Sequence, residues 1–282
     1  MRAQTDSGER RRPVAKKRFG QNFLEPVWAQ KVVDAIAPQS GDTFIEIGPG
    51  PGAITRLLAA RVRALVACEI DRDLAAALQA EAIPSVHVMV GDFLHVDPGT
   101  LTGAIEAAAP GADRVRVAGN LPYNVASPIM FRLVELARGG FPLHDATIML
   151  QREVADRLLA APGSRDYGVL SVLIGHRARV QRLLNLPPGA FRPAPKVHSS
   201  VVRLTFAAPT PPVSDETVLA AITSAVFSRR RKTMGNALLA HGGVTPVTAA
   251  GALARAGIDP GRRPETLSIA EFAALADAVA ST

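Results

Sequence analysis

Residues 43–52 read Thr-Phe-Ile-Glu-Ile-Gly-Pro-Gly-Pro-Gly, an apolar run that changes directly into a glycine-rich turn. The run predicts a buried strand over residues 43–48, and the stretch after the turn predicts a helix over residues 53–61. Glycines at such a turn let the backbone approach a ligand closely. The strand, the turn and the helix together predict the first unit of an α/β fold.

The same alternation of strand and helix patterns continues along the chain. Apolar strands are expected at residues 64–70, 86–90, 115–119 and 146–150, and an alanine- and leucine-rich helix at residues 71–81. This pattern is typical of a Rossmann-like, doubly wound parallel sheet. Ligands of such sheets bind beyond the carboxyl ends of the strands, where the strand order reverses.

The remaining third of the chain has a different organisation. Residues 177–184 and 199–206 predict strands that complete the sheet in the antiparallel direction, and the proline-rich, uncharged residues 207–212 predict a linker. Helical stretches without any strand pattern follow at residues 215–227, 232–239, 246–256 and 269–279. We therefore expect a disordered basic tail (1–15), an α/β domain (16–206) and a small all-helical domain (207–282).

The charge of the chain is unevenly distributed. The net charge is +7 and the isoelectric point is about 10.3. Residues 41–150 hold 8 Lys and Arg against 12 Asp and Glu, whereas residues 167–214 hold 6 basic residues and no acid, and residues 1–24 hold 7 basic residues and 2 acids. Basic flanks around a slightly acidic centre indicate contact with a nucleic-acid backbone.

Cysteine content and hydropathy narrow the class of protein further. Cys68 is the only cysteine and lies in an apolar strand, which predicts a core residue and a reducing, cytoplasmic location rather than a disulfide or a zinc site. No run of about 18 apolar residues predicts a membrane span. The polar, Arg-rich amino terminus lacks the apolar segment of a secretory signal. We expect a monomer that binds no metal and no membrane.

A cofactor pocket is predicted where three strands end. Gly48 begins the glycine-rich turn, and Glu69 ends the second strand, where a carboxylate can accept hydrogen bonds from a ribose diol. Asp92 and Phe93 follow the third strand and suit the amino group and the ring of an adenine. Asp92 could equally cap a turn. The glycine spacing alone also fits a dinucleotide, so the fourth strand decides between the cofactors.

The fourth strand is followed by Asn120, Leu121, Pro122 and Tyr123. The Asn120 side-chain oxygen and the Leu121 carbonyl can both accept hydrogen bonds from an exocyclic NH2 group. Pro122 keeps the turn rigid, and Tyr123 offers a face on which a base can stack. Hydride transfer needs no such clamp on an amine, whereas methyl transfer to an adenine N6 does. An ordinary loop with a core Tyr is the alternative.

Two further features point to RNA. Phe191 precedes two prolines in the acid-free stretch and could be a second stacking face for a flipped base, although a core Phe would look the same. Four adjacent cations follow an apolar helix, and we expect them to meet RNA phosphates rather than only solvent. These residues, named here the basic run, are Arg229, Arg230, Arg231 and Lys232.

Seven blocks of the chain resemble the ribosomal RNA adenine N6,N6-dimethyltransferases, in the order that this family has. The first block is residues 16–24, Lys-Lys-Arg-Phe-Gly-Gln-Asn-Phe-Leu. The others are residues 46–52, 69–71, 91–92, 120–123, 191–202 and 227–234. The resemblance is strongest to the bacterial branch that acts on the small ribosomal subunit. Met234 stands where the family usually has Leu, which is a mild apolar change.

The resemblance implies a class I methyltransferase domain that uses S-adenosylmethionine. The expected reaction is dimethylation of two adjacent adenosines in the 3′-terminal hairpin of 16S rRNA, within the 30S subunit. The implied cofactor contacts are Asn22, Leu24, Gly48, Glu69, Asp92 and Asn120. The implied pocket for the target base consists of Leu121, Pro122, Tyr123 and Phe191, and the helical domain is implied to bind the RNA.

Two alternative functions share parts of this pattern. A 23S rRNA adenine N6-methyltransferase of the macrolide-resistance type has similar motifs, but Leu121 and the Arg-Arg-Lys-Thr sequence at 230–233 favour the small-subunit enzyme. A non-catalytic nucleic-acid-binding relative is the second alternative. The intact residues 120–123 and Glu69 argue against it.

Overall fold

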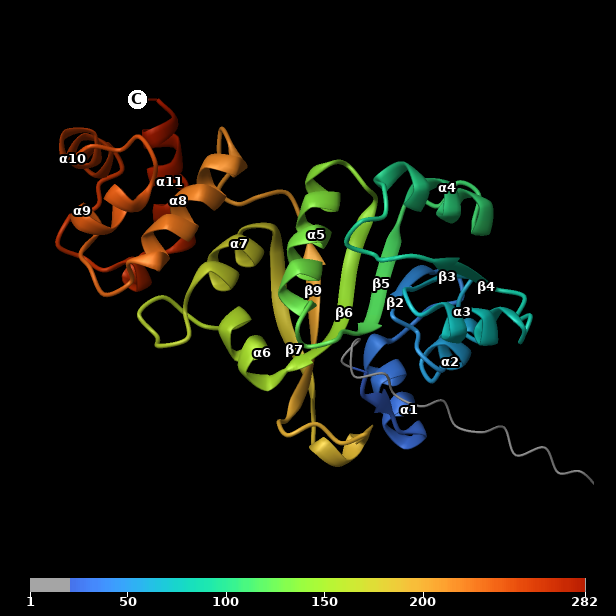
Figure 1. Cartoon of the computed structure of the whole chain (residues 1–282). Helices are drawn as coiled ribbons and strands as arrows, with labels where there is room; N and C mark the ends of the chain where they lie inside the picture. Colours follow the sequence, from blue (N-terminus) through green and yellow to red (C-terminus); the bar gives the residue numbers. More distant parts are fainter. Residues whose placement is uncertain (1–20, 282) are drawn as a thin grey trace, which may run out of the picture.

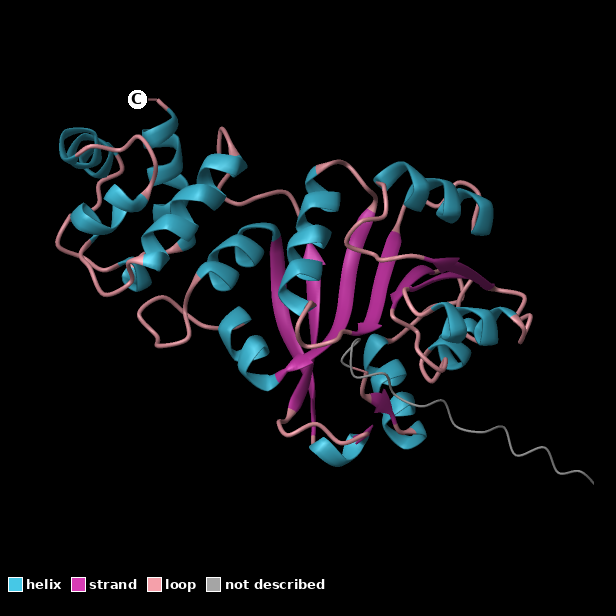
Figure 2. Ribbon diagram, viewed as in Figure 1, coloured by secondary structure: helices cyan, strands magenta, loops and turns pink. Residues whose placement is uncertain are grey.

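The structure of the protein is a computed structural model, and it describes residues 21–281. It contains an α/β domain, with a twisted sheet between two layers of helices, and a helical unit at its side (Figure 1). In Figure 2 the helical unit shows helices and loops only. This arrangement confirms the expected fold class.

The main sheet has seven strands in the order β4-β3-β2-β5-β6-β9-β7. Their bounds are Thr43–Ile47 (β2), Ala64–Glu69 (β3), Val86–Val90 (β4), Val115–Asn120 (β5), Leu143–Gln151 (β6), Ala178–Leu186 (β7) and Ser199–Phe206 (β9). A separate antiparallel pair joins β1 (Phe23–Leu24) to β8 (Phe191–Arg192). The chain reverses strand order between β2 and β5, so their carboxyl ends flank the switch point.

One sequence expectation about strand direction needs correction. Both carboxyl-terminal strands were expected to run antiparallel to the rest. Only β9 does so: it pairs antiparallel with both β6 and β7, and β7 therefore runs in the same direction as β6. The inserted β9 brings its amino end, rather than its carboxyl end, to the edge where the parallel strands end.

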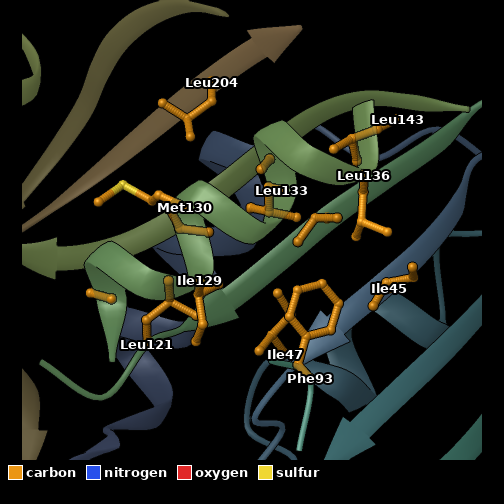
Figure 3. Close-up of a cluster of buried hydrophobic side chains, with 14 of the residues drawn as sticks. Ile45, Ile47, Phe93, Leu121, Ile129, Met130, Leu133, Leu136, Leu143 and Leu204 are labelled. Carbon is orange, nitrogen blue, oxygen red and sulfur yellow. The ribbon is translucent and has the colours of Figure 1, made fainter. Parts of the chain in front are cut away.

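The helices of the α/β domain cover both faces of the sheet. They are α1 (Pro26–Ile36), α2 (Thr55–Ala59), α3 (Arg72–Gln79), α4 (Pro98–Ala108), α5 (Ala126–Arg138), α6 (Arg152–Leu158) and α7 (Val169–Arg177). Successive strand residues alternate between two cores: Ile45 and Ile47 of β2 join α4, α5 and α6, whereas Phe44 joins α1 and α2. Figure 3 shows the first of these cores, where side chains of α5 pack on the sheet.

The helical unit contains α8 (Glu216–Ser228), α9 (Met234–Ala237), α10 (Pro246–Arg255) and α11 (Ile269–Ala280). Its core also includes Tyr167, which lies just before α7, and Val172, which lies within α7. Both residues precede the expected boundary at residue 206. The expected linker is held in place, because a ring nitrogen of His176 lies 2.7 Å from the carbonyl oxygen of Pro211. Because Tyr167 and Val172 belong to the core of the helical unit, this unit and the α/β domain share an apolar contact at α7.

Candidate active site

The carboxyl edge of the sheet borders a cavity of about 370 Å³. Its lining comes from β1 and from the residues at the ends of β2, β3, β4 and β5, because the carboxyl ends of parallel strands meet at one edge. Nine of the sequence-predicted site residues line it: Asn22, Leu24, Gly48, Glu69, Asp92, Asn120, Leu121, Pro122 and Tyr123. Phe191 and the basic run do not.

The glycine-rich turn has a backbone that other residues adopt with difficulty. Gly48, Gly50 and Gly52 have φ values of 68°, 57° and 82°. These values lie in the left-handed region, which favours glycine. The Gly50 amide donates a hydrogen bond to Glu69 Oε2 at 2.9 Å, so the turn is fixed to the end of the neighbouring strand. Gly48 and Gly50 thus border the cavity without placing a side chain in it, between the lining residues Pro49 and Pro51.

Glu69 is buried, and both of its carboxylate oxygens accept backbone hydrogen bonds. Oε2 accepts from Gly50, and Oε1 accepts from the Asp71 amide at 2.9 Å. Each oxygen has a second lone pair, so the carboxylate can still accept from a diol. The two amides hold the side chain in one orientation before any ligand arrives.

Glu46 is a second buried carboxyl group in the cavity, which sequence reasoning did not single out as a site residue. It is 1% exposed, and its Oε2 has no hydrogen-bond partner among the described residues. Burial raises the pKa of Glu46 to about 7; the charge of Glu69 adds to this effect, and the Thr55 hydroxyl and Arg56 guanidinium oppose it. The sequence contains a signal that could have identified Glu46 as a site residue: it stands two residues before Gly48, within the block of residues 46–52.

The end of β4 differs from the expectation in one respect. Asp92 caps its own turn, because Oδ1 accepts from the Leu94 amide at 3.0 Å and Oδ2 lies 2.9 Å from His95 Nδ1, yet it also lines the cavity. Phe93 was expected to offer a ring face. It is 3% exposed, and its side chain packs with Ile45 and Ile47 (Figure 3). Phe93 is still among the residues that line the cavity, and the exposed apolar side chain there is that of Ile70.

The Asn120 amide is oriented by a contact from the amino-terminal strap, residues 21–24. Its Nδ2 donates to the backbone carbonyl oxygen of Asn22 at 2.7 Å. Because a carbonyl oxygen can only accept, this contact requires the NH2 group on the Asn22 side. The acceptor Oδ1 is thereby left for a ligand in the cavity.

The rest of the turn acts through its main chain and one ring. Leu121 is 1% exposed and its side chain packs in the core beside Ile129 (Figure 3), so this side chain offers no surface to a substrate. The Pro122 carbonyl accepts from the Val125 amide at 3.1 Å and closes the turn into α5. Tyr123 is half-buried, and its hydroxyl lies 2.8 Å from Ser199 Oγ. Burial raises the pKa of Tyr123, and the Ser199 hydrogen bond opposes that rise.

Phe191 lies behind the cavity rather than in it. It is 4% exposed and packs among apolar side chains of the second core, including Leu186 and Val201. It is also paired with Leu24 in the two-stranded β1·β8 sheet. The role of its ring as a stacking face stays a prediction, and in this conformation the ring has no exposed face to offer.

The basic run is not uniform. Arg229, Arg231 and Lys232 are exposed where α8 ends, which suits contact with phosphates. Arg230 turns inward: its Nη2 donates to the Ser164 carbonyl oxygen at 3.1 Å, and its Nε lies 3.8 Å from Glu265 Oε2. Arg230 therefore links the helical unit to the loop before α7. The first residues of the amino-terminal block, 16–20, and the tail at 1–15 lie outside the described residues.

A cavity at the switch point, an acid at the end of β3 and a side-chain amide at the end of β5 are the arrangement of a class I methyltransferase. The family model described as "Ribosomal RNA adenine dimethylase" matches residues 13–281. The chain belongs to this family.

Relatives and solved structures agree with that membership. The ribosomal RNA small subunit methyltransferase A of Aromatoleum aromaticum is 44% identical, with 95% of each chain covered. The protein of the same name from Acidithiobacillus ferrooxidans is 43% identical, covering 94% of this chain and 95% of that one. A crystal structure of a dimethyladenosine transferase from Plasmodium falciparum has a TM-score of 0.72 at 23% identity, covering 90% of this chain and 95% of that one. The 23S rRNA methyltransferase ErmE has a TM-score of 0.63 at 23% identity, covering 92% of this chain and all of that one. These two solved structures show that the chain shares their fold.

Proposed function

We propose that this enzyme dimethylates N6 of two adjacent adenosines in the 3′-terminal hairpin of 16S rRNA, within the 30S subunit or its precursor. The observation that carries the proposal is the Asn120 amide. Its NH2 group is held by Asn22, and its oxygen remains as an acceptor at the edge of a cavity that also contains Glu69. An acceptor fixed beside a pocket for a nucleoside is what amine methylation requires.

The residues of the cavity fit S-adenosylmethionine. Glu69 would accept from its ribose hydroxyls, Asp92 from its adenine amino group, and the glycine-rich turn leaves space for its chain. The buried Glu46 oxygen, which has no partner within residues 21–281, fits a cationic ligand, because a cation nearby would stabilise the ionised carboxylate. When bound, this cofactor supplies an electrophilic methyl group on a sulfonium.

The target amine needs positioning more than it needs a base. Asn120 Oδ1 and the Leu121 carbonyl oxygen would accept the two N6 hydrogens, which favours a pyramidal nitrogen whose lone pair faces the methyl group. As the N–C bond forms and the C–S bond breaks, the nitrogen becomes acidic and its proton passes to Asn120 Oδ1 or to water. The Tyr123 ring would stack on the base and favour the passing positive charge.

The relatives favour the small-subunit reaction over the alternatives. Proteins more than 40% identical over nearly the whole chain carry a small-subunit name. The likeness to ErmE is a likeness of fold, at 23% identity. A non-catalytic role is disfavoured, because the acceptors of the cavity are intact and Asn120 is oriented for use.

Mapping the modified nucleotide tests the proposal directly. We expect the protein, given labelled S-adenosylmethionine, to label 30S subunits from cells that lack this modification and to produce N6,N6-dimethyladenosine at two neighbouring positions near the 3′ end of 16S rRNA. Subunits that already carry the modification are the control and should take up no label. Labelling of 23S rRNA instead would favour the macrolide-resistance reaction.

The remaining expectations concern location and assembly. Within residues 21–281 no helix is long and apolar enough to cross a membrane. The same residues contain no group of three or more His, Cys, Asp or Glu side chains placed to hold a metal ion. The cytoplasmic location and the monomeric state stay predictions. Light scattering of the purified protein, alone and with RNA, would test the second.

A further inference from the structure

The amino end of β9 lies at the catalytic edge because this strand runs against its neighbours. Ser199, the first residue of β9, pairs with Gln151 at the end of β6 and with Leu186 at the end of β7. A strand parallel to β6 would present its carboxyl end there. The antiparallel insertion therefore places a residue from the segment 191–202 beside the turn that follows β5.

Ser199 makes one side-chain contact with the proposed catalytic turn. Its Oγ lies 2.8 Å from the Tyr123 hydroxyl, although the two residues are 76 positions apart. Ser199 is 0% exposed, so water does not compete for this hydroxyl. The contact fixes the far end of a ring whose near end is fixed by the backbone of the turn.

The Ser199 anchor is itself held firmly. Its backbone lies between β6 and β7, and the preceding carbonyl, that of His198, accepts from the Arg152 amide at 2.9 Å where α6 begins. A Tyr side chain otherwise turns about two torsions, and a stacking platform must be held in one plane to position a base. We propose that Ser199 is a positioning residue, whose hydroxyl holds the Tyr123 ring in the plane that stacks on the target adenine.

This inference rests on the proposed function, and Ser200 provides a matched control. Ser200 is the next residue of the same strand, is also 0% exposed and donates its Oγ to Asn185 Oδ1 at 2.9 Å. Neither serine lines the cavity, but successive residues of a strand point to opposite faces, and of the two only Ser199 contacts the Tyr123 hydroxyl. Ser200→Ala thus removes an equally buried hydroxyl from the same strand without touching Tyr123.

Single-turnover methylation of 30S subunits, with cofactor saturating and enzyme in excess over the subunits, separates the two serines. We expect Ser199→Ala to slow the methylation step about 3- to 10-fold, the scale of one hydrogen bond, while the affinities for cofactor and for 30S stay unchanged. Ser200→Ala should stay within about 2-fold of wild type. An inactive wild-type enzyme would contradict the proposed function, whereas an active one with equal rates for Ser199→Ala and wild type would overturn only this inference.

Tyr123→Phe removes the same hydrogen bond from its other end, without changing the core. We expect a slowing similar to that of Ser199→Ala, and a double variant no slower than the slower single variant, because both changes break one contact. Effects that multiply in the double variant would show that the two hydroxyls act separately and would overturn the inference. This comparison remains informative even if Ser199→Ala folds poorly.

A second measurement does not depend on activity. The chain has two tyrosines, so a protein with labelled tyrosine gives few ring signals in an NMR spectrum. Ser199→Ala should shift and broaden the Tyr123 signals, whereas those of Tyr167, buried in the helical unit, should not change. Unchanged Tyr123 signals would mean that the ring is held by its other neighbours and would also overturn the inference.

Discussion

At the scale of single residues, two buried carboxyl groups of the cavity differ in how they are paired. Glu69 receives two backbone amides, whereas one oxygen of Glu46 has no partner among the described residues. Burial without partners favours the neutral form of a carboxyl group. The two acids therefore suit different tasks, one as a fixed acceptor and the other as a group that responds to charge.

Glu69→Ala should weaken the binding of S-adenosylmethionine by about 1–3 kcal/mol, because a charged acceptor for the ribose is removed. The Gly50 and Asp71 amides would also be left without their partner, so part of the effect comes from a looser turn. Calorimetric titration of the folded variant measures it. Glu69→Gln, which keeps one oxygen acceptor, should have a smaller effect, and an unchanged affinity in Glu69→Ala would contradict the assignment.

Glu46 should make the stability of the protein depend on pH. Its pKa is about 7 when folded and near 4.5 in the unfolded chain, so the folded protein retains a proton that the unfolded chain has released. The free energy of unfolding contributed by this group should therefore be fully present below pH 4.5 and should fall as pH rises to 7, by up to about 3 kcal/mol. Denaturation of wild type and Glu46→Gln from pH 5 to 8 tests this. The variant should gain stability relative to wild type as pH rises, and a constant difference would contradict the prediction.

Two substitutions of Asn120 separate its donor from its acceptor. Asn120→Ala should nearly abolish methylation, because no apolar side chain replaces the directed oxygen. Asn120→Asp keeps an oxygen but faces the Asn22 carbonyl with a carboxylate, so we expect the strap to be repelled and cofactor affinity to fall as well. Single-turnover rates and cofactor titration measure the two effects. An Asn120→Ala enzyme near the wild-type rate would exclude the amine clamp.

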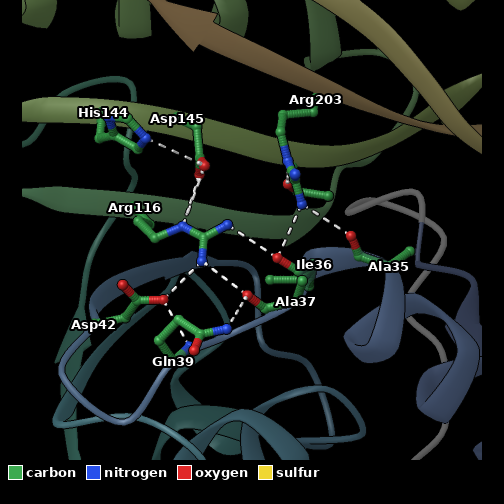
Figure 4. Close-up of polar contacts among 10 residues, drawn as sticks. Ala35, Ile36, Ala37, Gln39, Asp42, Arg116, His144, Asp145 and Arg203 are labelled. Carbon is green, nitrogen blue, oxygen red and sulfur yellow. Dashed lines mark hydrogen bonds and ion pairs between the residues drawn. The ribbon is translucent and has the colours of Figure 1, made fainter.

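At the scale of elements, two arginines of the sheet donate hydrogen bonds to the carboxyl end of α1 and so join this helix to the sheet (Figure 4). Arg116 of β5 donates to the Ile36 carbonyl at 2.9 Å and Arg203 of β9 to the same oxygen at 2.9 Å. Cations at this end satisfy carbonyls that a helix leaves unpaired and oppose the negative end of its dipole. The helix that follows the amino-terminal strap is thus fixed from the edge of the sheet opposite the cavity.

Arg116→Met should lower the free energy of unfolding by about 3–5 kcal/mol, because the buried Asp145 carboxylate and the half-buried Asp42 carboxylate would be left without this cation. Arg61→Met is the control: its ion pair with Asp34 of α1 is exposed, so the decrease should be below about 1 kcal/mol. Urea denaturation of both variants tests this. Similar decreases in the two would mean that the Arg116 network contributes no more than a surface ion pair.

At the scale of the whole molecule, the helical unit is attached through the loop before α7. The rings of Tyr167 and Phe227 pack edge to face, with their centroids 6.2 Å apart. The Gly163 amide donates to the Glu265 carbonyl oxygen at 2.6 Å. Arg230 adds its contact with Ser164. The basic run therefore has one residue that holds the two parts together and three whose side chains are exposed.

Replacing Arg229, Arg231 and Lys232 with alanine should weaken binding to 30S subunits and flatten its dependence on salt. The slope of log K against log salt should become shallower by about 1 for every cation that neutralises a phosphate in the wild-type complex. Arg230→Ala should leave that slope unchanged and lower the melting temperature instead. Binding titrations at several salt concentrations distinguish them. A triple variant with the wild-type slope would mean that these cations are solvated surface.

Much of the site could be predicted because its signals are local. Glycines in the left-handed region, an acid where an apolar run ends and an Asn before a rigid Pro depend on their chain neighbours, and parallel strands bring all such ends to one edge. Nine predicted residues accordingly line one cavity. Helices α1 and α4–α7 were not assigned from the sequence, although α1 and α4 both begin with a Pro and Asp97 caps α4.

The sequence by itself thus determined the succession of strands along the chain and the residues at the strand ends. Only the tertiary structure decided that β9 enters the sheet antiparallel, that Phe191 packs behind the cavity, that Arg230 turns inward and that Ser199 meets Tyr123. The physical reason is distance along the chain. Each of these outcomes depends on contacts between segments tens of residues apart, whose pairing is chosen by the burial and hydrogen bonding of the whole fold and not by neighbours in the sequence.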